Sequence, residues 1–141
     1  MEILAYKDFM LYVGKTIEYC QTIEHDIKWL YALMKNGDPL QNMNVISSWT
    51  LGNTVFELES LDNSDKNPSL GKKEYGLLKQ ITGERNYICH QIFRDFLYEP
   101  NFMESKAYYD ACLRLLTFYK KIEKLQKQIE DFRLLYAKKR T

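Results

Sequence analysis

Little in this sequence interrupts a helix. The 141 residues include only three prolines and six glycines, and these are the two residue types least tolerated inside helices. All three prolines lie among polar residues, in the segments 36–39, 63–71 and 99–101, which predicts three loops. Between these loops the apolar residues recur with helical spacing, and no alternating run is long enough for a strand. The sequence therefore predicts an all-α chain.

Cysteines and long apolar runs are also scarce. Cys20, Cys89 and Cys112 are odd in number and form no C-x-x-C pair, which argues against a disulfide framework and a zinc site. Charged residues interrupt the apolar N-terminus, so it lacks the core of a signal peptide, and no segment approaches transmembrane length. We therefore expect a cytoplasmic protein that has no membrane partner.

Charge is almost balanced over the whole chain but not along it. Residues 1–71 hold five Lys or Arg against ten Asp or Glu, residues 72–104 hold five against five, and residues 105–141 hold ten against four. Such a basic C-terminal segment can attract a polyanion, yet an ordinary solvated helix face has the same composition. Charge alone therefore leaves the partner open.

Two long apolar stripes predict the main helices of a bundle. Apolar residues step by threes and fours over 9–34 and again over 108–136. Shorter helices are predicted over 44–61, with Ser47 or Ser48 as the N-cap, and over 72–98. Because 45% of the residues are hydrophobic, the chain can bury a sizeable core. We expect one domain over 1–141, folded as an antiparallel bundle of four main helices.

The helix predicted over 72–98 carries polar residues in unusual positions. Its core stripe is apolar except at Arg85, and it reads Leu78, Ile81, Arg85, Ile88, Ile92, Phe96. Gly83, Asn86 and His90 follow one another at spacings of three and four on the neighbouring stripe. A glycine inside a helix costs about 1 kcal/mol relative to alanine. We therefore expect another backbone or a ligand to come close at Gly83.

Arg85, Asn86 and His90 have side chains suited to phosphate chemistry on RNA. A guanidinium offers forked donors to phosphate oxygens, and a histidine can give or take a proton near neutral pH. His90 could therefore act as general base or acid while Arg85 stabilises the charge on phosphorus, without a metal. Arg85 and His90 differ by about 140° around the helix axis. This separation favours a site in a cleft between helices or between two copies of the chain.

The segment Glu84 to His90, with the sequence ERNYICH, resembles the motif of the HEPN superfamily. In that motif an arginine, commonly followed by asparagine, precedes a histidine with a few residues between them. The resemblance implies a small helical bundle, usually dimeric, that cleaves RNA without a metal at Arg85, Asn86 and His90. It also implies a toxin or antiphage-defence component, which an antitoxin protein could bind. Other members are non-catalytic RNA-binding or protein-interaction modules, and this is the alternative interpretation.

Some features point away from particular versions of this function. Ile92 stands where the HepT branch has a tyrosine that its antitoxin modifies, so the resemblance does not imply that route of regulation. No nucleotide-binding glycine loop or metal-ligand cluster is present, so no cofactor or metal is expected. His25 lies between two acidic residues, but an isolated helical histidine is more often structural.

A purely structural interpretation also remains open. Arg85 could pair with a carboxylate in the core, and His90 could be a hydrogen-bonded histidine between helices. The chain would then be a helical partner with no RNA chemistry of its own.

Overall fold

The chain is built of helices joined by loops. The computed structural model describes residues 3–64 and 68–139, and this part contains no strand. The described residues form five α-helices and one short 3₁₀ helix. These are α1 (Tyr6–Met34), α2 (Pro39–Ile46), α3 (Leu51–Asn63), α4 (Lys72–His90), η1 (Phe102–Glu104) and α5 (Lys106–Lys139). The prediction of an all-α bundle is confirmed.

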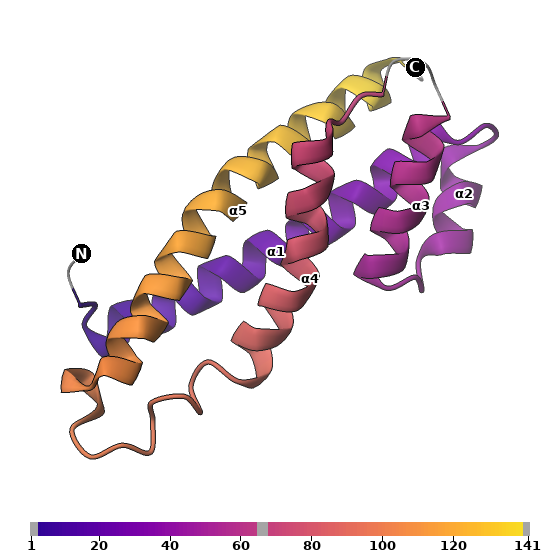
Figure 1. Cartoon of the computed structure of the whole chain (residues 1–141). Helices are drawn as coiled ribbons and strands as arrows, with labels where there is room; N and C mark the ends of the chain where they lie inside the picture. Colours follow the sequence, from indigo (N-terminus) through magenta and orange to yellow (C-terminus); the bar gives the residue numbers. More distant parts are fainter. Residues whose placement is uncertain (1–2, 65–67, 140–141) are drawn as a thin grey trace.

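Successive helices run in opposite directions, so α1 and α5 run the same way (Figure 1). At one end the Tyr108 hydroxyl donates a hydrogen bond to the Leu4 carbonyl at 2.6 Å. Toward the other end Arg133 pairs with Asp26. At about 1.5 Å per residue the two helices extend for roughly 45 and 50 Å. The short α2 adds one reversal to the expected four-helix order, which makes the first and last helices parallel.

The segment expected as one helix over 44–61 belongs to two helices. The Asp38 carboxylate accepts a backbone hydrogen bond at the start of α2, and a proline occupies its first turn. The Thr50 hydroxyl then caps α3 by accepting from a backbone N–H at 3.1 Å. The prediction of an N-cap at Ser47 or Ser48 is therefore wrong. The loop predicted over 36–39 is present over 36–38, and its last residue, Pro39, begins α2.

Helix α4 ends at His90, whereas the sequence pattern predicted a helix as far as Tyr98. The backbone N–H groups of Gln91 and Ile92 both donate to the Tyr87 carbonyl at 2.9 Å, and turns follow. Because the chain leaves the helix here, Phe93 and Phe96 reach a cluster of rings at the end of the bundle where α5 begins. The rings in this cluster are Tyr6, Phe9, Phe93, Phe96, Phe102 and Tyr108. Burial of aromatic surface against remote residues therefore overrides the helical pattern.

A buried carboxylate fixes the start of α4. Asp62, at the end of α3, is 4% exposed and accepts from the backbone N–H groups of Ser69 and Leu70 at 2.8 and 3.0 Å. It also accepts from the Tyr75 hydroxyl at 2.7 Å. Burial and this hydrogen bond raise the pKa of Tyr75, so the hydroxyl remains a donor at neutral pH. These bonds join α3 to α4 and help to set the rotation of α4 about its axis.

A second buried carboxylate joins α1 to α5. Asp26 is 3% exposed, and its Oδ1 lies 2.8 Å from the Nε of Arg133. Burial raises the pKa of Asp26, and the positive charge of Arg133 is the largest influence that lowers it. A buried carboxylate without a partner costs several kcal/mol. The pair therefore stabilises the long α1–α5 contact chiefly by keeping Asp26 compensated.

Replacement of Arg133 should make stability depend on pH. In Arg133→Met the pKa of Asp26 rises further, so its ionised form becomes more costly in the folded state. Because the folded-state pKa lies above the unfolded value of about 3.9, the cost is present at neutral pH and lost in acid. We expect a loss of about 2 kcal/mol at neutral pH, measured by urea unfolding, and a smaller loss in acid. The double variant with Asp26→Asn should remove this pH dependence, and an equal loss at both pH values would contradict the explanation.

Candidate functional site

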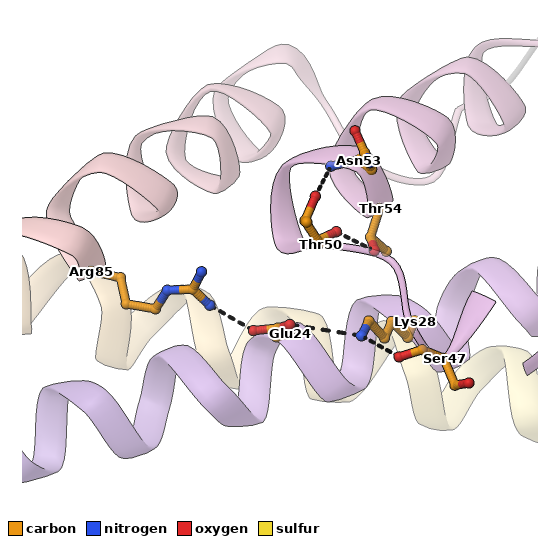
Figure 2. Close-up of polar contacts among 7 residues, drawn as sticks. All are labelled: Glu24, Lys28, Ser47, Thr50, Asn53, Thr54 and Arg85. Carbon is orange, nitrogen blue, oxygen red and sulfur yellow. Dashed lines mark hydrogen bonds and ion pairs between the residues drawn. The ribbon is translucent and has the colours of Figure 1, made fainter. Parts of the chain in front are cut away.

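Arg85 lies on the side of α4 that faces α1. Its Nη1 donates to the Oε2 of Glu24 at 2.7 Å, as Figure 2 shows. Glu24 also lies 3.7 Å from the ammonium of Lys28, which donates to the Ser47 carbonyl at 3.0 Å. The side chains of Arg85 and Glu24 are 26% and 25% exposed, so the pair contributes less than about 1 kcal/mol. The structure thus gives Arg85 the carboxylate partner of the structural interpretation, although at a half-buried position.

Asn86 and His90 lie on a different side of the same helix. Both are exposed, and they line an open hollow of about 590 Å³. We call it the His90 hollow, and its lining residues are Gly83, Asn86, Tyr87, His90, Gln91 and Arg114. Arg85 does not line this hollow, because it lies about 140° from His90 around the helix axis. Within one chain, the arginine that shares a hollow with His90 is Arg114.

Arg114, from α5, is held firmly at the edge of the His90 hollow. Its Nε and Nη2 donate to the two carboxylate oxygens of Glu84 at 3.1 and 2.8 Å. Its guanidinium also lies 3.4 Å from the centroid of the Tyr87 ring. Contact with both a carboxylate and a ring fixes the orientation of a guanidinium. The side chain is nevertheless 46% exposed, so it can also bind a phosphate oxygen.

Tyr87 is poorly suited to act as a base in this hollow. Its hydroxyl donates to Asp95 at 2.5 Å. Burial and this hydrogen bond raise the pKa of Tyr87 to about 12, so the phenol is protonated at neutral pH. Histidine is the residue type that exchanges protons near neutral pH, and His90 supplies the imidazole of the hollow. Among the described residues, one chain therefore offers one imidazole at this place.

Other chemistry-bearing groups are separate from this hollow. In residues 3–64 and 68–139, no group of three or more His, Cys, Asp or Glu side chains is arranged to hold a metal ion. His25 is exposed on α1 beside Trp29, with 6.4 Å between the ring centroids. Burial raises the pKa of the Cys20 thiol to about 12, which makes it unreactive. Within the same described ranges, no helix combines the length and the hydrophobicity that crossing a membrane requires.

Gly83 has no close neighbour within the described part of the chain. A Cβ added there would meet no atom within 4 Å, so the close approach expected from the sequence is not made by these residues. Gly76, also exposed on α4, has equally open space around it. Gly83 differs in one respect, because it lines the His90 hollow. Packing within the described residues therefore does not explain why a glycine, which weakens a helix, stands at position 83.

Alanine at either glycine should stabilise the isolated chain. Both positions are helical and open, so Gly83→Ala and Gly76→Ala should each raise the free energy of unfolding by about 0.5–1 kcal/mol. Urea unfolding at low protein concentration, followed by circular dichroism, measures this change. Gly76→Ala is the matched control on the same helix. A loss of stability in Gly83→Ala alone would show that the space beside Gly83 is not free in the isolated chain.

Comparison with known proteins adds no family assignment to this geometry. No family model matches the chain, and no curated protein or solved structure matches it either. The resemblance of residues 84–90 to the HEPN motif therefore remains a prediction from the sequence.

Proposed function

We propose that this chain is a metal-independent endoribonuclease of the HEPN kind that acts on RNA as a homodimer. The observation that supports it most is the composition of the His90 hollow. This hollow combines an exposed imidazole, the amide of Asn86 and the oriented guanidinium of Arg114 around open space. An imidazole can move protons, and amide and guanidinium donors can stabilise charge on a phosphate.

In the proposed reaction the 2′-hydroxyl of RNA attacks the adjacent phosphorus. The bond from O2′ to phosphorus forms as the bond from phosphorus to O5′ breaks, which leaves a cyclic phosphate and a 5′-hydroxyl. One group must take the proton from O2′, and another must give a proton to O5′. His90 performs one of these transfers, while Arg114 and Asn86 hold the phosphate oxygens. The reaction therefore needs a second acid or base besides one His90.

A second copy of the chain would supply the missing group. Two α4 helices facing each other across a two-fold axis would bring two His90 side chains to one groove. The absence of a side chain at Gly83 supports this arrangement, because it leaves open surface beside Asn86 and His90. Arg85 faces α1 and does not line the hollow of its own chain, so the HEPN-like motif, and not this geometry, is what supports a part for it in the groove. Its Nη1 is bound to Glu24, while Nε and Nη2 have no partner among the described residues.

Variants of the purified chain test this mechanism. His90→Ala should abolish RNA cleavage measured in EDTA, because the proton transfer is lost. Arg114→Ala and Arg85→Ala should each slow cleavage by about 10²-fold, as expected for loss of a group that stabilises transition-state charge. The product should carry a cyclic phosphate. If His90→Ala cleaves RNA as fast as the parent, the enzyme proposal is wrong.

Glu24→Gln is the matched control for Arg85→Ala. Both variants break the same ion pair, but Glu24→Gln keeps the arginine. If Arg85 is catalytic, cleavage should survive in Glu24→Gln and fall in Arg85→Ala. Equal losses in both would assign Arg85 to holding α4 against α1 and leave Arg114 as the cation of the site.

The second candidate is a non-catalytic module that binds RNA or another protein. It is favoured by one observation, namely that both arginines are already engaged, Arg85 with Glu24 and Arg114 with Glu84. A cation that is already neutralised by a carboxylate has less charge to offer a developing transition state, whereas a static binding surface does not need that charge. RNA binding without any product after long incubation would support this candidate against the enzyme.

As a toxin or antiphage-defence component, the chain should arrest growth when it is expressed in bacteria. His90→Ala should relieve the arrest, because it removes the proton-transfer group. His25→Ala should not, since His25 is exposed on α1 and lies outside the His90 hollow. Counts of viable cells after induction, with matched protein levels, measure the effect. Unchanged toxicity in His90→Ala would contradict this role, and a protein that suppresses the arrest would be the expected antitoxin.

A further inference from the structure

A second hollow, of about 360 Å³, lies between α4 and α5 toward the start of α4. Lysines surround it and leucines form part of its lining. We call it the lysine groove, and its main residues are Lys73, Lys120, Lys121, Lys124, Leu77 and Leu125. Three of the lysines come from about one turn of α5, and Lys73 comes from α4. The basic C-terminal segment noted in the sequence thus gathers part of its charge at one concave place.

The lysines of this groove have no ion-pair partner in the part of the chain that the structure describes. None of the four forms an ion pair with another of the described residues, whereas Lys28, Lys79 and Lys127 each do. One carboxylate, that of Glu74, also lines the groove, and it accepts from the backbone N–H of Gly71 at the start of α4. Four cations therefore face one carboxylate. This excess of positive charge favours a polyanionic occupant.

The lysine groove and the His90 hollow lie along the same pair of helices, α4 and α5. A third hollow, of about 380 Å³, shares Lys121 with the lysine groove and Arg114 with the His90 hollow. Glu84 in this middle part is matched by Arg114, and Asp110 adds one more carboxylate. The distance along α5 from Lys124 to Arg114 is about 15 Å at 1.5 Å per residue. One extended polyanionic chain could therefore occupy all three hollows.

We propose that the lysine groove holds the phosphates of a single-stranded RNA segment that flanks the phosphate bound at the His90 hollow. The inference rests on the proposed function, because it takes RNA as the substrate. Lysines bind backbone phosphates without reading bases. Leu125 is 1% exposed, so the half-buried Leu77 is the leucine of the lining that can contact a base or ribose face. A paired helix keeps its bases stacked inside, so its bases cannot make this contact. An amphipathic acidic helix would need a longer apolar stripe than Leu77 provides.

Binding of an RNA that cannot be cleaved tests this inference separately from catalysis. The probe is a fluorescent 2′-O-methyl oligouridylate, which lacks the attacking hydroxyl, and anisotropy is measured over a range of salt concentrations. The triple variant Lys120→Gln, Lys121→Gln, Lys124→Gln should raise Kd at least tenfold. The slope of log Kd against log salt should fall by about 2, because each single-strand phosphate contact contributes about 0.7.

The control is a triple variant with the same change in net charge. It replaces Lys7, Lys15 and Lys106, exposed lysines that line none of the three hollows, with glutamine. It should change Kd less than threefold, and both triple variants should match the parent in urea unfolding. Because the probe cannot be cleaved, its binding is measured independently of whether the chain is a nuclease.

Two results would overturn the inference. One is that the groove variant binds the probe with the same Kd and salt slope as the control variant. The other is that the chain binds a poly-glutamate peptide through these lysines and does not bind the RNA probe. The second result would assign the groove to an acidic protein partner.

Discussion

The parallel contact between α1 and α5 is the constraint on which the rest of the structure depends. It is the most extensive helix pair of the bundle, and it is anchored near one end by the Asp26–Arg133 pair and at the other by aromatic rings. Helix α4 packs against both members of this pair. Asp62 holds its start, and the Arg85–Glu24 pair holds it near its end. The rotation of α4, which decides which side chains reach solvent, follows from these contacts.

Helix geometry separates Arg85 from His90, and the rotation of α4 decides what each of them faces. With 3.6 residues per turn, residues five apart cannot share one face of a helix. Arg85 faces α1 and is held by Glu24, while His90 faces an open hollow. The cation beside His90 comes instead from α5, where Arg114 is oriented by Glu84 and the Tyr87 ring. A site with more than one proton-transfer group therefore requires a second surface, and two copies of the chain would provide one.

The early end of α4 shapes the same region. The chain leaves the helix after His90 because Ile92 and Phe96 are buried completely at the base of the bundle. His90 thus stands in the last turn, at the edge of the His90 hollow and exposed to solvent. Along α4 and α5, a third hollow shares Arg114 with this hollow and Lys121 with the lysine groove. The aromatic packing that ends α4 therefore places His90 in the last turn of the helix.

Local patterns alone determined the all-α class, the long helices near 9–34 and 108–136, and the common face of Asn86 and His90. Helical spacing is a property of neighbouring residues, so these features needed no partner. The tertiary structure decided the rest. The end of α4 depends on rings far apart in the chain. The division within 44–61, by contrast, is set locally by the Asp38 and Thr50 caps, which the apolar pattern concealed. The place of Arg114 beside His90 arises only when α5 packs on α4, because no local spacing relates two residues on different helices.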